Sequence, residues 1–171
     1  MTIHYDSSTL EVIVKDDSYR YRRIMGEHHV MLYYSLPQHV EPPVGAWIEY
    51  EGRTYTLEQQ VKLIKNSTRN FEYVAVFESP AAKLKKYKMR NTVDGRLKFP
   101  LTATPQEHLQ MIVDNMNNRE SGWSMGDYVA SAEKLVSYNH DFCIDALVKL
   151  AEAFETEYEI DGKVIHLRKV E

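Results

Sequence analysis

The sequence predicts an α+β protein: an antiparallel β-barrel or sandwich in residues 1–98, followed by a small α+β domain in residues 99–171. Three observations carry this prediction. Apolar residues alternate with polar ones through much of the first half, two later segments show helical periodicity, and Asp161-Gly162 separates two strand-like runs near the end. A period of two is typical of strands and a period near 3.6 of helices.

The strands of the first half follow from this alternation. It is strongest in residues 71–78, and residues 30–36 repeat it. Residues 47–50 and 54–57 are expected to pair across Glu51-Gly52, while residues 59–64 are expected to form a hairpin with 71–78. Several short strands separated by turns favour a small barrel or sandwich.

The first helix is expected to begin at Thr104. Thr104 and Glu107 have the spacing of a capping box, and Pro105 occupies the first helical position, where its missing N–H costs nothing. An apolar stripe at helical spacing follows, made of Leu109, Ile112, Val113 and Met116. His108 is expected on the exposed side of this helix, and the asparagines of 115–118 are expected to end it.

The second helix is expected over roughly 141–154, with Asn139 or His140 as its cap and Asp141 near its positive end. A C-terminal hairpin is expected to follow, with strands at 157–160 and 163–167. The turn at Asp161-Gly162 is a strong hairpin signal, because both residues tolerate the left-handed backbone that such a turn needs.

Composition narrows the class of protein. A chain of 171 residues with 43% hydrophobic and 27% charged residues has the composition of a globular protein. A net charge of −4 provides no general attraction to nucleic acid. Cys143 is the single cysteine, so no internal disulfide forms, and assembly in a reducing cytoplasm is expected. No signal peptide or membrane span is expected.

A basic segment lies between the two halves. Residues 80–98 contain seven lysines or arginines and one acidic residue, Asp94. Such a segment could follow a phosphate backbone. A solvated strand or loop is the preferred interpretation, because charge runs are usually surface.

No catalytic, cofactor-binding or metal-binding residue is predicted. His28 and His29 resemble a metal pair, but adjacent residues of a strand point to opposite faces. Cys143 beside His140 could be a nucleophile with its base, yet its spacing from Leu147 places it on the buried stripe of the helix. Glu152 and Glu155 are expected on a solvated helix face. None of these residues forms a recognisable catalytic motif.

Exposed aromatics offer a different function. Tyr19, Tyr21, Tyr33, Tyr34 and Trp47 lie in the β-rich half, where exposed tyrosine and tryptophan could bind sugars or a protein partner. Packing into the barrel core is the preferred interpretation.

At the level of pattern, the chain resembles phage tail proteins of the baseplate-hub or tail-associated (Tal-like) family, particularly those of Bacteroides-type prophages. The resemblance rests on residues 99–105, the helix through 112–117, the stretch 122–126, and 146–154 with its hairpin. This chain resembles the N-terminal part of such proteins, which are commonly longer.

The resemblance implies a non-catalytic virion structural protein in the tail-tip hub, assembled in the bacterial host cytoplasm. Such hubs are rings, usually homotrimers, that close the tail tube and organise the baseplate. They contact the distal tail ring protein and the tape-measure protein, and they meet DNA only as it passes through the channel. A carbohydrate-binding module is the alternative, and a cysteine hydrolase using Cys143 and His140 is a third possibility.

Overall fold

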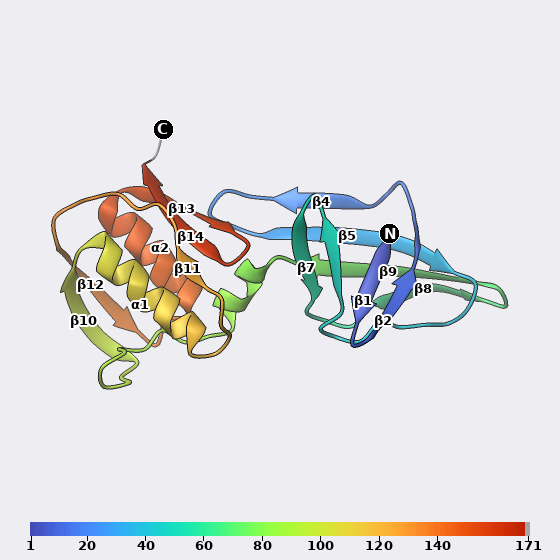
Figure 1. The fold of residues 1–171 in the computed structure, drawn as a ribbon, viewed down its shortest axis with the longest axis horizontal. Coiled ribbons are helices and arrows are strands. Elements are labelled where there is room, and N and C mark those ends of the chain that lie inside the picture. Colours follow the sequence, from blue (N-terminus) through green and yellow to red (C-terminus); the bar gives the residue numbers. More distant parts are fainter. Residues whose placement is uncertain (170–171) are drawn as a thin grey trace. The chain divides into compact units, whose positions relative to one another are not determined.

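A computed structural model describes residues 1–169 of the chain (Figure 1). The chain divides into two compact units, Met1–Pro80 (unit 1) and Ala81–Glu171 (unit 2). The segment 81–98, expected in the first domain, therefore lies in the second unit. The chain as a whole consists mainly of β-strands, with two α-helices, which agrees with a β-rich α+β fold.

Unit 1 is a curled antiparallel sheet in which β5 and β9 form the central pair. The sheet runs in the order β2-β1-β6-β7-β9-β5-β3, with β4 added beside β5 and β8 beside β9. Its strands are β1 (Thr2–Tyr5), β2 (Ser8–Glu11), β3 (Ile13–Val14), β4 (Tyr19–Arg22), β5 (His28–Leu36), β6 (Trp47–Tyr50), β7 (Arg53–Leu57), β8 (Lys62–Ser67) and β9 (Asn70–Glu78). The expected pairings of β6 with β7 and of β8 with β9 are confirmed.

The curl of the sheet comes from one stretch of chain, residues 8–14. Its first part, β2, pairs with β1, and its second part, β3, pairs with β5. Because β1 and β5 lie four strand steps apart in the sheet order, this stretch connects two distant parts of the same sheet. The concave side can then be filled by side chains, as in small barrels.

The core of unit 1 consists of the inward-facing residues of these strands. Tyr34, Tyr55 and Tyr73 are fully buried among aliphatic residues. The Tyr73 hydroxyl lies 2.7 Å from His39 Nδ1 and accepts from the Val40 N–H. The Tyr55 hydroxyl lies 2.7 Å from His28 Nε2. These contacts provide the hydrogen bonds that the buried hydroxyl groups of Tyr55 and Tyr73 need.

His28 makes the stability of unit 1 depend on pH. Burial, followed by the charges of Arg22, Arg53 and Arg20, lowers the pKa of His28 to about 4. Below pH 6.5 the unfolded chain binds a proton that the folded chain excludes, so stability falls as pH drops from 6.5 to about 4. The shift corresponds to at most roughly 3 kcal/mol, and screening at this partly buried site reduces it to about 1–2 kcal/mol.

Urea unfolding at pH 7.5 and pH 4.5 measures this loss. In the variant His28→Gln, which does not titrate, about 1–2 kcal/mol less stability should be lost across that interval. Carboxylates contribute equally to both proteins, so the difference between them isolates the histidine. Equal losses in the two proteins would contradict the assignment.

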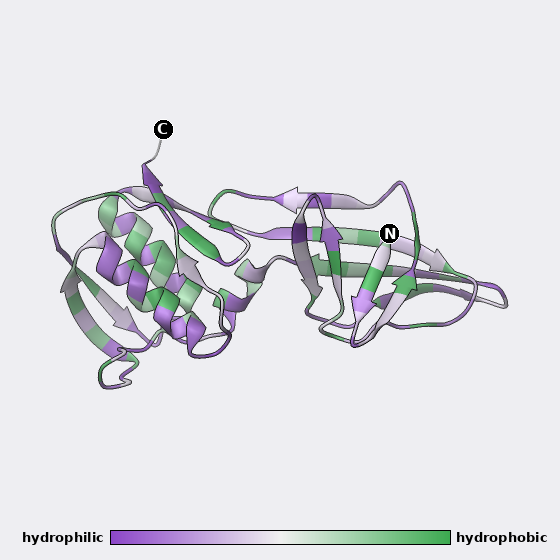
Figure 2. Ribbon diagram, in the orientation of Figure 1, coloured by the Kyte–Doolittle hydropathy of each residue, from purple (hydrophilic) through white to green (hydrophobic). Residues whose placement is uncertain are grey.

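Unit 2 contains two α-helices and two small sheets. Strands β10 (Lys98–Ala103) and β12 (Lys134–Asn139) form an antiparallel pair, and β14 lies between β13 and β11. The other elements are η1 (Pro80–Lys85), α1 (Pro105–Asn117), β11 (Ser124–Met125), α2 (Cys143–Phe154), β13 (Thr156–Asp161) and β14 (Val164–Lys169). The hydropathy pattern in Figure 2 shows apolar residues along one side of each helix. No helix of residues 1–169 has the length and apolar character needed to cross a membrane.

The segment 81–98 belongs to unit 2 because its apolar residues are buried there. Leu84 and Met89 are completely buried. The Met89 N–H donates to the Asp141 carbonyl at 2.9 Å, and the Arg90 N–H donates to the Asn115 side chain at 3.0 Å. Because charged residues dominate the sequence of this segment, the sequence alone does not indicate that Leu84 and Met89 are core residues.

Helix α1 confirms the expected start and corrects the expected faces. The capping box is present: the Glu107 N–H donates to Thr104 Oγ1, and the Thr104 N–H donates to the Glu107 carboxylate. The expectation that His108 is exposed is wrong, since its side chain is completely buried. Asn115 is also buried, and the helix ends at Asn117 with Asn118 as its C-cap, within the asparagine-rich stretch that was expected to end it.

Helix α2 begins two residues later than expected. Phe142 is its N-cap residue, and the Phe142 N–H donates to the Asp145 carboxylate at 3.0 Å. Neither Asn139 nor His140 caps the helix. The expected C-terminal hairpin is confirmed, with β13 and β14 in register and Gly162 in a left-handed conformation, φ +60°, at the turn.

Candidate assembly surfaces

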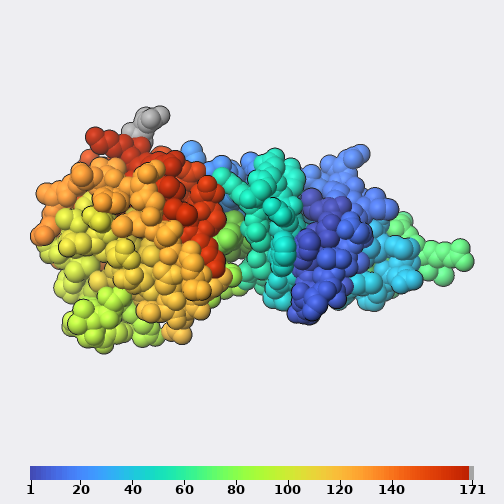
Figure 3. Space-filling model, viewed as in Figure 1, coloured from blue at the N-terminus to red at the C-terminus, as the bar shows by residue number. Residues whose placement is uncertain are grey.

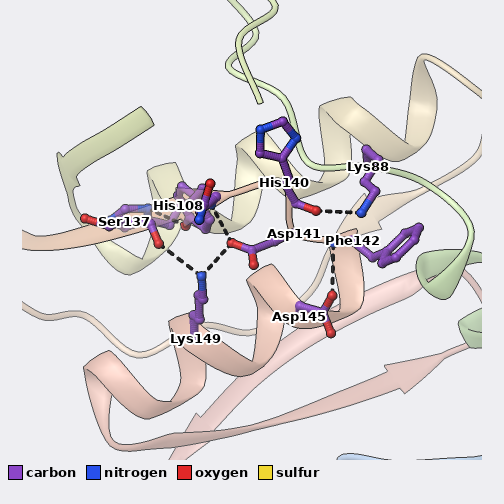
Figure 4. Close-up of polar contacts among 10 residues, drawn as sticks. Lys88, His108, Ser137, His140, Asp141, Phe142, Asp145 and Lys149 are labelled. Carbon is purple, nitrogen blue, oxygen red and sulfur yellow. Dashed lines mark hydrogen bonds and ion pairs between the residues drawn. The ribbon is translucent and has the colours of Figure 1, made fainter. Parts of the chain in front are cut away.

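The pair that could have formed a cysteine nucleophile is not assembled. Cys143 is completely buried, and burial raises the pKa of its thiol to about 12. The contacts of His140 run elsewhere: its N–H donates to the Leu97 carbonyl, and its carbonyl accepts from Lys88 Nζ (Figure 4). A neutral buried thiol is a packing residue, as the helical spacing indicated.

Figure 4 shows what the polar residues around His140 do instead. Asp141 accepts from the Asn139 N–H at 2.9 Å and from Lys149 Nζ at 2.6 Å. Lys149 also donates to the Ser137 carbonyl at 3.2 Å. These bonds join the end of β12 to helix α2, so the network is structural.

His28 and His29 point to opposite faces of strand β5, as strand geometry predicts. His28 bonds to Tyr55 on the core side of β5, whereas the His29 ring stacks on Tyr21 with centroids 5.2 Å apart. They do not converge on one ion. Among residues 1–169 no group of three or more metal-ligating side chains is present.

Several charged side chains of the basic segment 80–98 form ion pairs or ring contacts within unit 2. Lys83 forms a 2.5 Å ion pair with Glu120, and Glu120 also pairs with Lys163 at 2.7 Å. Lys88 Nζ lies 3.5 Å from the centre of the Phe142 ring. Arg96 pairs with Asp94 at 2.6 Å. These contacts favour the interpretation of the segment as a loop with charges on its surface. They do not form a continuous basic strip that could follow a phosphate backbone.

The expectation that the aromatic residues of the first half are core is only partly right. Tyr34, Tyr55 and Tyr73 are core, but Tyr19, Tyr21 and Trp47 are 48%, 42% and 38% exposed. Strand propensity does not separate the two groups, since all of these residues suit a strand. Which face each residue occupies depends on the pairing of distant strands.

Strand β3 is the most exposed apolar feature of unit 1. Ile13 is 74% exposed and Val14 is 37% exposed, although they point to opposite faces of the sheet. Within residues 1–169, β3 pairs with β5 alone and has a second, unpaired edge. An exposed apolar edge strand is a site at which another chain can pair or pack.

Strand β8 presents a second edge. In the part of the chain that the structure describes, it pairs with β9 alone, and Ile64 is 52% exposed. The pairing shifts between Leu63 and Lys65, an irregularity that interrupts a sheet edge. Unit 2 has exposed apolar residues too, Val93 at 92% and Leu135 at 63%.

This fold is shared with solved structures of tail-related proteins. No known family and no curated protein matches the sequence. The prophage tail protein gp18 from Listeria monocytogenes EGD-e is similar in structure, with a TM-score of 0.71 and 9% sequence identity, over 95% of this chain and 48% of its own.

A second solved structure with this fold is the E. coli c3393 protein. It is described as a component of the type VI secretion system that exhibits structural similarity to T4 bacteriophage tail proteins gp27 and gp5. It aligns over 94% of this chain and 49% of its own, with a TM-score of 0.54 and 9% identity. At this identity the likeness establishes a shared fold, and the chain spans about half the length of each neighbour.

Proposed function

We propose that this chain is a structural protein of a phage or prophage tail, acting in the tail-tip hub that closes the tail tube and organises the baseplate. The observation that carries the proposal is the tail-type fold, which extends over 95% of the chain. In this role unit 1 is a β-barrel-like hub domain. A Tal-like protein of a Bacteroides-type prophage is the specific version of this proposal.

The proposed mechanism is mechanical and non-catalytic. A homotrimeric ring holds the tube closed, contacts the distal tail ring protein and the tape-measure protein, and rearranges when the tail engages a cell. Complementary surfaces are sufficient for this role, and no reactive side chain is needed. The exposed apolar edge at Ile13 and Val14 supports it, because assembly would cover such a surface.

Light scattering of the purified chain over a range of concentrations tests self-association. We expect the mass to rise from monomer to trimer with concentration, and a defined complex to form when the distal tail ring protein of the same phage is added. The variant Ile13→Asp places a charge on the exposed edge and should weaken the trimer at least tenfold.

Val93→Asp is the matched control, since Val93 is an exposed aliphatic residue of unit 2. It should leave the mass unchanged, and both variants should retain the circular dichroism of the parent. A protein that stays monomeric at every concentration and ignores the ring protein would overturn the hub proposal.

A further inference from the structure

Trp47 faces outward from strand β6, and the next residue on the strand, Ile48, faces the core. Ile48 is completely buried, whereas Trp47 is 38% exposed and Glu49 also faces outward. The His4 ring lies nearly parallel to the indole, with centroids 4.1 Å apart and planes 13° apart. This stacking holds the indole in one orientation and leaves part of it exposed.

The strand register shows which side chains surround the indole. Trp47 lies opposite His4 on β1 and Thr56 on β7, and His4 lies opposite Thr9 on β2. In Figure 3, residues of β1 and β2 (dark blue) and of β6 and β7 (teal) lie side by side on one surface of unit 1. Partners in register on neighbouring strands are about 5 Å apart.

A parallel row lies two residues along the same strands. It pairs Thr2 with Glu11 and Glu49 with Thr54, and the Thr2 hydroxyl donates to the Glu11 carboxylate at 2.6 Å. The exposed indole is therefore set among threonine hydroxyls and carboxylates. Its aliphatic neighbours on β6 and β1, Ile48 and Ile3, face the core.

We propose that this face of β2-β1-β6-β7 binds an uncharged pyranose of a surface glycan. A pyranose has an apolar C–H face that can pack on the indole, as ligands pack on aromatic side chains with polar groups placed around them. Its hydroxyls can donate to Glu49 and Glu11 and exchange hydrogen bonds with the threonines. The same carboxylates disfavour a sialylated or phosphorylated sugar through charge repulsion.

The site goes beyond the tail-hub role and is tested separately. The full chain is applied to an array of uncharged, amino-substituted and sialylated oligosaccharides, and the best ligand is then titrated by calorimetry. We expect binding to uncharged pyranosides, a loss of at least tenfold in affinity for Trp47→Ala, and a smaller loss for Trp47→Phe, which keeps an aromatic ring. Glu49→Gln should lose affinity severalfold.

Tyr128→Ala is the control, because Tyr128 is 41% exposed and lies in unit 2. It should bind as the parent does. A silent array would overturn the proposal, as would equal affinity of the parent and Trp47→Ala, or a preference for sialylated sugars. None of these results changes the light-scattering mass, so failure of the sugar site is distinguishable from failure of the hub.

Discussion

Replacing His108 by alanine should destabilise unit 2 by about 3 kcal/mol, a large effect for a residue that helical spacing assigns to the surface. His108 Nε2 lies 3.2 Å from the Lys134 carbonyl and must donate to it, so Nδ1 accepts from the Tyr138 hydroxyl at 2.9 Å. Burial lowers the pKa of His108, which favours this neutral form. Removing the imidazole leaves a buried hydroxyl without its acceptor and creates a cavity.

Urea unfolding followed by tryptophan emission measures the loss, in a Trp47→Phe background so that the signal comes from the buried Trp123 of unit 2. Gln106→Ala, on the exposed side of the same helix, is the matched control and should change stability by less than about 0.5 kcal/mol. If the two variants were equally stable, His108 would not be a core residue.

Asn115→Ala should cost about 2–3 kcal/mol, for a related reason. The Asn115 side chain accepts from the Arg90 N–H at 3.0 Å and donates to the Arg90 carbonyl at 2.8 Å. It thus supplies hydrogen bonds to a segment outside any sheet. Alanine cannot make these bonds, and the backbone groups of Arg90 lose their partner in a partly buried position.

Hydrogen exchange measured by mass spectrometry separates this effect from general destabilisation. Peptides covering residues 86–92 should lose protection in Asn115→Ala, while those covering β10 and β12 should change less. The neighbouring variant Asn118→Ala, at the C-cap of the helix, serves as the comparison. Uniform loss of protection across unit 2 would argue against a local role for Asn115.

Local signals in the sequence were sufficient for most elements. The capping box at Thr104 and the Asp161-Gly162 turn specify their structures through bonds within a few residues, and both are confirmed. The buried stripe of α2, with Cys143 on it, also follows from spacing alone. The tail-type fold agrees with the resemblance drawn from the pattern of the chain.

The errors concern polar residues whose partners are distant in sequence. Helical spacing places His108 on the surface and does not show that Asn115 is buried, because the burial of these residues depends on Tyr138 and Arg90, which lie more than twenty residues away in sequence. The exposure of Trp47 similarly depends on how β6 pairs with β1 and β7. Periodicity identifies an apolar stripe, but it does not identify a polar side chain that completes a core through hydrogen bonds.

The division at Pro80 has a consequence for synthesis of the chain on the ribosome. Every strand of unit 1 lies within residues 1–80, so its sheet can form as soon as that length has emerged. Residues 81–98 are in the opposite situation, because Lys83, Met89 and Arg90 bind partners that are translated later: Glu120, Asp141 and Asn115. Until those residues emerge from the ribosome, residues 81–98 remain unfolded while unit 1 is already folded.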